Sequence, residues 1–342
     1  MFRFRLAAAI AAFLPLASLS SAASAQDVTL RYSNWLPPGF HLVDKLMKPW
    51  IAEVERVTEG RVKVEMTPKV VGTVAGQYDV LAEGLADLSL WTPGYSPGRF
   101  PLAEGFELPF VGSDPVKLSV AVWNAYEKYL ANTDTFSKIH VVSIFSSNSS
   151  HAMTTKEPLP TVASFNGKKL RTPSPVAIEV LNKLGAVSVP KPMGELYEMA
   201  SSGVVDGAIM PIDPIRGFKL QDVLKHITRV DGGLNNTAMV VGINPAKWQE
   251  ISEKDRAAIT AISGAVLAEK NGQLLQSQMD ETIAEVTKAG MTVQDMAPEE
   301  REKLRQTLKP IQEAWFVKAK EHGLTNPEEL LGYVTTQTGS GL

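Results

Sequence analysis

Along the first half of the chain, segments whose apolar residues alternate as in a strand are followed by segments whose apolar residues recur at helical spacing. Residues 28–33 alternate as in a strand, whereas apolar side chains over residues 43–57 recur at helical spacing. The same reasoning predicts strands at 61–66, 88–91 and 139–145, and helices at 77–83 and from Asp114 to about 130. Strands separated by helices of this length are typical of parallel α/β units.

A second set of such elements begins near Ser150. It contains predicted strands at 168–172, 187–189 and 204–210, and predicted helices at 176–184 and 194–201. The apolar stretch 236–243 predicts a strand that returns to the first set. The rest is helical, with one helix from Asn244, a long one capped by Ser252 to about Lys288, and two that start at Pro298 and Asn326.

Two phrases of similar form lie about 120 residues apart, EGLADLSL at 83–90 and SGVVDGAI at 202–209. Each ends a helical stretch with Gly, turns through an Asp and enters a short apolar strand. The strands end in the loops WTPGY at 91–95 and MPIDP at 210–214, which are rich in groups able to contact a ligand. Ligands of α/β sheets gather at the carboxyl ends of strands, so we expect two similar lobes with a cleft between them.

The first 25 residues have the form of a secretory signal peptide. Arg3 and Arg5 precede an apolar run from 6 to about 19, and Ala23-Ser24-Ala25 offers a small-x-small cleavage site. The run is shorter than a membrane span, which disfavours an anchor. We expect cleavage after Ala25 and a periplasmic mature chain.

Charge and composition exclude several classes of protein. Without Arg3 and Arg5 the mature chain has 32 basic and 37 acidic residues, a net charge of −5, which disfavours nucleic acid as a partner. The absence of Cys excludes disulfides, thiolate catalysis and cysteine zinc sites. The five histidines are not at metal-ligand spacing, and no nucleotide fingerprint follows a strand, so we expect no metal and no cofactor. Residues 94–98 match G-x-S-x-G, but Pro97 lacks the N–H that a nucleophile elbow requires.

An ordered set of phrases gives the chain a family resemblance. They are FELPF at 106–110, NGKKLR at 166–171, GVVDG at 203–207, and VVGIN at 240–244 followed by Lys247-Trp248. The chain resembles the solute receptors of TRAP (tripartite ATP-independent periplasmic) transporters over about residues 28–331. The resemblance implies a two-lobe α/β venus-flytrap fold with hinge-crossing strands and C-terminal wrapping helices. It also implies a receptor that delivers a small organic acid to a sodium-driven TRAP membrane permease.

The predicted division of the chain follows from this order of elements. Residues 26–146 with about 239–275 form lobe I, 147–238 with about 276–296 form lobe II, and 297–342 form helices that pack across both. We expect a monomer.

Arg171 is the first candidate for ligand binding. It lies near the end of a predicted strand before a Pro-broken turn, and its guanidinium matches a carboxylate with two parallel hydrogen bonds. The resemblance implies the same role, since the family holds the substrate carboxylate with an arginine at this point. A structural ion pair is the alternative.

His151 stands near the place where many members of the family carry a second arginine. The sequence there is SNSSH at 147–151, so the second cation is absent or replaced by imidazole. This departure favours a monocarboxylate with a polar or aromatic body over a dicarboxylate. A structurally satisfied histidine is the alternative.

The remaining candidates stand at strand ends. Aromatic rings there supply a flat apolar wall, amides fix hydroxyl or keto oxygens, and a methionine lines the second lobe. Core packing and turn formation are the competing interpretations. The candidates are Trp35, Trp91 and Tyr95; Asn34, Asn148 and Asn236; and Met210.

Two functions of other classes remain as alternatives to a transport receptor. One is an exported hydrolase or lyase on the same fold, for which His151 is the sole candidate base in the cleft. The other is a ligand receptor for a sensor kinase. The sequence separates these alternatives poorly; finding a gene for a two-component membrane permease beside this one would favour transport.

Overall fold

The computed structural model describes residues 27–340, so the predicted signal peptide and cleavage site lie outside the described residues. Within this range the strands form two sheets. Sheet A has the order β2-β1-β3-β10-β4, and β10 runs antiparallel to both of its neighbours. Its strands are β1 (Val28–Ser33), β2 (Val62–Met66), β3 (Leu88–Trp91), β4 (His140–Ser146) and β10 (Ala238–Ile243).

Sheet B has the order β11-β9-β5-β8-β6-β7. Its strands are β5 (His151–Thr154), β6 (Lys169–Thr172), β7 (Val187–Pro190), β8 (Gly207–Met210), β9 (His226–Arg229) and β11 (Thr292–Asp295). The chain passes from sheet A to sheet B between β4 and β5, and returns between β9 and β10. We call the part built on sheet A lobe I and the part built on sheet B lobe II, which confirms the predicted two-lobe α/β fold.

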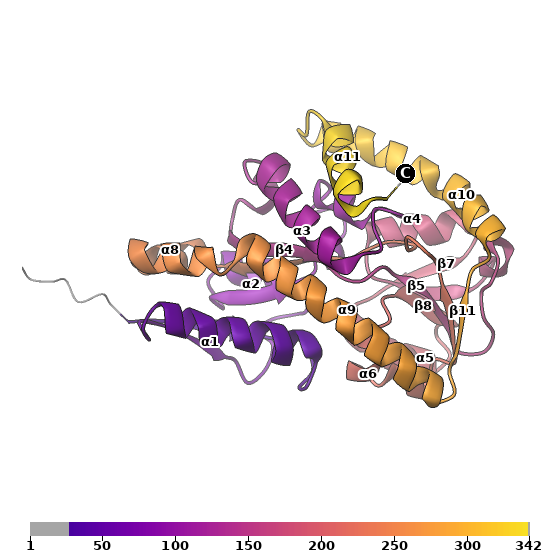
Figure 1. The fold of residues 1–342 in the computed structure, drawn as a ribbon, viewed down its shortest axis with the longest axis horizontal. Coiled ribbons are helices and arrows are strands. Elements are labelled where there is room, and N and C mark those ends of the chain that lie inside the picture. The colour runs from indigo at the N-terminus through magenta and orange to yellow at the C-terminus, as the bar shows by residue number, and fades with distance from the viewer. Residues whose placement is uncertain (1–26, 341–342) are drawn as a thin grey trace, which may run out of the picture.

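Helices cover both sheets and join the lobes (Figure 1). The helices are α1 (Lys48–Val57), α2 (Gln77–Ala82), α3 (Pro115–Ala125), α4 (Pro175–Lys183), α5 (Leu196–Ser201), α6 (Pro214–Gly217), α7 (Pro245–Glu250), α8 (Glu253–Ala261), α9 (Gly264–Lys288), α10 (Pro298–Glu321) and α11 (Pro327–Thr338). Helix α9 runs diagonally across the molecule, packing on α3 and β4 of lobe I and on β11 of lobe II. Helices α10 and α11 close the opposite side, where Trp315 donates to the carbonyl of Pro101.

The two matching phrases build the same structure in each lobe. Gly84 and Gly203 end α2 and α5 with φ of 70° and 74°, a conformation that glycine adopts without strain. The Asp that follows binds the neighbouring strand twice. Asp87 accepts the N–H of Arg31 at 2.8 Å and donates its own N–H to the Arg31 carbonyl, and Asp206 does the same with Lys169. In each lobe the same pair of hydrogen bonds therefore fixes the strand after the Asp, β3 or β8, against its parallel neighbour, β1 or β6.

The long helix predicted from Ser252 to Lys288 is two helices. Ser252 caps α8, with its hydroxyl accepting the N–H of Asp255, but the helix ends at Ala261 and a new one begins at Gly264. Gly264 has φ of 55°, and a Cβ there would lie 2.7 Å from the ring of Trp123. Helix α9 therefore begins at a glycine whose backbone packs closely against the ring of Trp123.

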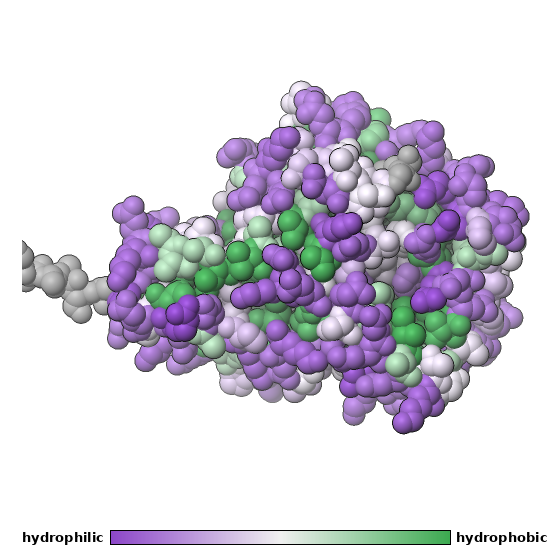
Figure 2. Space-filling model, viewed as in Figure 1, coloured by the Kyte–Doolittle hydropathy of each residue, from purple (hydrophilic) through white to green (hydrophobic). Residues whose placement is uncertain are grey.

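The surface is mostly polar in the view of Figure 2. Apolar side chains gather beside the start of α9, near the junction with α8. Among residues 27–340, no helix combines the length and apolar character that a membrane crossing requires.

Candidate functional site

A cavity of about 60 Å³ lies where the carboxyl ends of strands from both sheets face each other. Tyr95 follows β3 of lobe I, whereas Arg171 and Asp213 come from β6 and the loop after β8 of lobe II. The polar residues lining it are Thr92, Tyr95, Ser147, Arg171, Asp213 and Thr237. The apolar ones are Trp35, Leu36, Phe40, Leu42, Pro173, Met193, Pro211, Pro214, Phe218, Met239 and Leu275.

Arg171 is a buried cation without a carboxylate partner. Its side chain is completely buried, its Nε donates to the carbonyl of Lys191 at 2.7 Å, and its Nη2 lies 3.4 Å from the hydroxyl of Tyr95. Nη1 has no hydrogen-bond partner, and no carboxylate within residues 27–340 forms an ion pair with the guanidinium. Burial lowers the pKa of Arg171, the sign of an unneutralised charge in a dry site. The cavity wall thus carries a fork of donors suited to an anion.

Tyr95 and Trp35 of lobe I line the same cavity, and the Tyr95 hydroxyl contacts Arg171. The Tyr95 hydroxyl accepts the backbone N–H of Met193 at 3.2 Å, so one oxygen joins lobe I to two points of lobe II. The Trp35 indole is fixed by a 2.8 Å hydrogen bond to the carbonyl of Leu90 and meets Tyr95 edge to face, with ring centroids 5.9 Å apart. The two rings form an aromatic wall whose orientation is set by the protein itself.

Asp213 places a carboxyl group in the same cavity wall as the guanidinium of Arg171. It is 5% exposed, and its Oδ1 accepts the amide of Asn148 at 2.8 Å. Its Oδ2 lies 3.1 Å from Nε2 of His41, a buried residue of lobe I. The approach is not aligned for a hydrogen bond, and Nε2 of His41 has no hydrogen-bond partner.

The structure brings together three of the residues predicted from sequence, Arg171, Trp35 and Tyr95. Trp91 lies instead in the core of lobe I against Tyr78 and Phe136, and Met210 in the core of lobe II. Asn34 forms a local turn in which its side chain bonds Leu36 in both directions. None of these last three lines the cavity.

Asn148, Asn236 and His151 lie outside the cavity wall near the crossing between the lobes. The side-chain amide of Asn148 donates a hydrogen bond to Asp213, and the side-chain oxygen of Asn236 accepts the hydroxyl of Ser149 at 3.2 Å. His151 is buried on β5, and its Nδ1 accepts the N–H of Val230 at 3.2 Å. Burial lowers the pKa of His151 to about 4, so the ring is neutral at neutral pH and supplies no second cation.

Several wall residues were missed by the sequence reasoning. Asp213 stands in the MPIDP loop after β8, which the strand-end argument had marked as able to contact a ligand, so a search for charged groups there would have found it. Phe40 in the wall, and His41 that contacts Asp213, follow the Pro-Gly break after β1 in the same way. Met193, Phe218 and Met239 show no signal of their own, because core residues have the same character.

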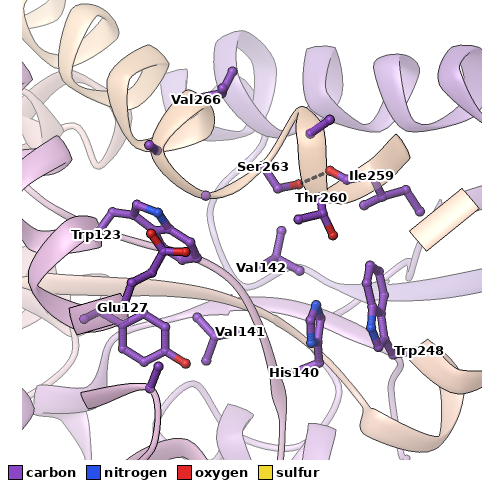
Figure 3. Close-up of a pocket in the computed structure, with 15 residues that line it drawn as sticks. Trp123, Glu127, His140, Val141, Val142, Trp248, Ile259, Thr260, Ser263 and Val266 are labelled. Carbon is purple, nitrogen blue, oxygen red and sulfur yellow. Dashed lines mark hydrogen bonds between the residues drawn. The ribbon is translucent and has the colours of Figure 1, made fainter. Parts of the chain in front are cut away.

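A larger cavity of about 370 Å³ lies within lobe I, between β4, α3 and the α7–α9 region (Figure 3). His140 stacks on Trp248 with centroids 4.0 Å apart, and Glu127 stands across the cavity beside Trp123. Burial lowers the pKa of His140 to about 4, so its ring is neutral at neutral pH, and within residues 27–340 the wall presents the carboxyl group of Glu127 and no Lys or Arg side chain. Such a wall repels organic anions and involves one lobe alone, so the smaller cavity between the lobes is the better candidate site. Within the described range, no cluster of three or more His, Cys, Asp or Glu side chains is arranged to hold a metal ion.

Comparison with known proteins decides the family. The profile described as "Bacterial extracellular solute-binding protein, family 7" matches residues 33–319, which is most of the chain. The chain belongs to this family. Its members include TRAP solute receptors, so the predicted resemblance is confirmed.

The relatives carry different ligands on one fold. A protein of Comamonas testosteroni named "Outer membrane transporter protein TsaT" is 29% identical over 342 residues, 99% of each chain. A TRAP periplasmic solute-binding protein of Bordetella bronchiseptica, solved with bound (R)- and (S)-mandelate, is 30% identical, with a TM-score of 0.88 and coverage of 91% of this chain and 99% of that one. A marine metagenome TRAP protein described as specific for aromatic acids, solved with 3-hydroxybenzoate, is 26% identical with a TM-score of 0.86 over 92% and 98% of the two chains.

Proposed function

We propose that this family 7 receptor captures an aromatic monocarboxylate in the cavity between its lobes and delivers it to a TRAP membrane permease. The observation that carries the proposal is the Arg171 guanidinium, buried and without a carboxylate partner, in a cavity walled by Trp35, Phe40, Tyr95 and Phe218. A ligand carboxylate supplies the missing charge, and the rings supply a surface for its aromatic body.

The single positive charge supports one carboxylate rather than two. Among residues 27–340, Arg171 is the one Lys or Arg side chain in the cavity wall, and His151 is neutral and turned to the backbone of Val230. A second ligand carboxylate would be buried without a countercharge, close to the carboxylate of Asp213, which is unfavourable. The mandelate and 3-hydroxybenzoate reported for two similar receptors are monocarboxylates with rings, in agreement with this proposal.

A calorimetric panel tests the proposal. We expect benzoate, hydroxybenzoates or mandelate to bind at about micromolar Kd, which corresponds to about −8 kcal/mol, and C4-dicarboxylates to bind far more weakly. The ligand should be recovered chemically unchanged, whereas conversion to a product would place the chain among enzymes. Tight binding of succinate or malate with no aromatic binding would refute the proposal.

A further inference from the structure

The wall of the cavity contains two charged groups of opposite sign at separate places. The guanidinium of Arg171 points toward the end of β7, because its Nε bonds the carbonyl of Lys191. Asp213 follows β8, and the order β8-β6-β7 puts β8 on the other side of β6. Arg171 itself stands on β6, the direct neighbour of β8, but its guanidinium lies at the end of β7. Neighbouring strands are about 4.8 Å apart, so the ends of β7 and β8 are separated by roughly 10 Å.

Asp213 is not explained by carboxylate binding. A buried carboxylate in the same cavity repels an anionic ligand unless it contacts another part of that ligand. Its Oδ1 accepts the amide of Asn148, whereas Oδ2 lies 3.1 Å from Nε2 of His41, an ion-pair distance when that ring is protonated but one without hydrogen-bond geometry. Oδ2 is therefore an acceptor in the wall with capacity for a further donor.

We propose that Asp213 selects aromatic carboxylates that carry a hydroxyl group remote from the carboxylate, with Oδ2 accepting the hydroxyl hydrogen. This inference rests on the proposed function and narrows its ligand class to ring-hydroxylated acids. The carboxylate of such a ligand reaches Arg171, its ring lies against Trp35 and Phe218, and its hydroxyl reaches Asp213.

A hydroxyl fits this place better than an ammonium group. An ammonium has three donors to satisfy, and the loop that carries Asp213 otherwise adds only the apolar Pro211 and Pro214 to the cavity wall. It would also bring a cation next to Nε2 of His41. A hydroxyl has one donor, which Oδ2 of Asp213 satisfies.

Matched ligands test the inference on the wild-type protein by calorimetry. We expect 3- or 4-hydroxybenzoate to bind between about ten- and a hundredfold more tightly than benzoate, the range for a hydrogen bond to a charged group. The corresponding methoxybenzoate, which keeps the oxygen but lacks the donor, should lose this advantage. Equal binding of the hydroxybenzoates and benzoate would overturn the inference while leaving the proposed function standing. Tighter binding of 3-(aminomethyl)benzoate would overturn it in favour of an ammonium ligand.

The variant Asp213→Asn then assigns the preference to its residue. We expect the affinity ratio of hydroxybenzoate to benzoate to fall to within about threefold, because a charged acceptor is replaced by a neutral amide. Asp231→Asn, a change at an exposed carboxylate paired with Arg301, is the matched control and should keep the wild-type ratio. A ratio unchanged in Asp213→Asn would overturn the inference. The variant Arg171→Met, by contrast, tests the proposed function alone, because we expect it to lose binding of all aromatic acids, with or without a hydroxyl group.

Discussion

At the scale of single residues, Arg171 links stability to ligand binding. Its guanidinium is buried with one nitrogen unpaired, so the folded protein bears a desolvation cost that a ligand carboxylate removes. Arg171→Met should weaken aromatic acid binding by about 2–5 kcal/mol and leave the melting temperature without ligand unchanged or higher. Calorimetry and thermal melts measure the two effects. Arg56→Met, at an exposed arginine paired with Glu53, should alter neither, and binding by Arg171→Met close to wild type would make Arg171 a structural residue.

Glu107 is a second buried ionisable residue, behind the cavity in lobe I. It is 2% exposed, its Oε1 accepts the N–H of Ala238 at 3.0 Å, and burial raises its pKa to about 8. The folded state therefore holds a proton that the unfolded chain releases above its ordinary pKa of 4.5. The associated stability is present below pH 4.5 and is lost as the pH rises to 8, a change on the order of 5 kcal/mol.

Glu107→Gln isolates this contribution, because the amide does not ionise. The difference in unfolding free energy between variant and wild type should shift in favour of the variant between pH 5 and pH 9. Denaturant unfolding at both pH values measures it, with the exposed Glu83→Gln as control. A difference independent of pH would mean that Glu107 is already ionised in the folded protein at pH 5.

Sequence could identify Arg171 because a strand end, a Pro-broken turn and a family phrase coincide there. It could not separate Trp35, which lines the cavity, from Trp91, which is buried in the core, since both stand at or just after the end of a predicted strand. In the structure Trp91 is the last residue of β3 and packs against Tyr78 and Phe136, whereas Trp35 lies in the loop two residues beyond β1. His151 likewise faces the backbone of β9's end, which no local pattern reveals.

At the scale of elements, the short 3₁₀ turn Pro93–Tyr95 packs directly on the start of α4 across the lobes. A Cβ on Gly94 would lie 2.5 Å from the Cβ of Ser174, the residue that caps α4, and 3.2 Å from Oε2 of Glu107. Because Gly94 has no Cβ, the 3₁₀ turn of lobe I can pack this closely against Ser174 of lobe II.

Gly94→Ala should disfavour the closed arrangement without altering any residue of the cavity wall. Overpacking of this kind costs about 1–3 kcal/mol, so we expect affinity for an aromatic acid to fall by roughly five- to a hundredfold. Calorimetry checks this, and Gly332→Ala on α11, where a Cβ meets no atom within 4 Å, is the matched control. Unchanged affinity in Gly94→Ala would show that ligand is held without this contact.

Strands with a clear apolar pattern were predictable, whereas those without one were not. The strands β1, β3, β6 and β10 follow their apolar patterns, but β9 and β11 include charged or polar positions, as in HITR and TVQD. They are strands because they pair with each other and because β9 pairs with β5, a tertiary effect. The Ser263-Gly264 break was visible as a dipeptide, but its meaning depends on Trp123, far away in sequence.

At the scale of the whole molecule, the cavity wall comes from both lobes, so the proposed function predicts that binding and closure are coupled. Trp35 and Tyr95 belong to lobe I and Arg171 to lobe II, and a ligand that contacts all three favours the state in which both lobes reach it. Small-angle scattering should show a smaller radius of gyration at saturating aromatic acid. Arg171→Met should show no such change under the same conditions, and an unchanged wild-type envelope would contradict a closing receptor.

The unpaired charge of Arg171 also bears on how faithfully a transport system tells loaded receptors from empty ones. A closed, empty receptor buries a bare cation, and a closed, loaded receptor buries a neutral pair. Each 1.4 kcal/mol of that difference makes empty closure tenfold rarer. Under the proposed function, a permease that recognises only the closed shape would therefore seldom dock an empty receptor, and the Arg171 side chain would both hold the cargo and report its presence.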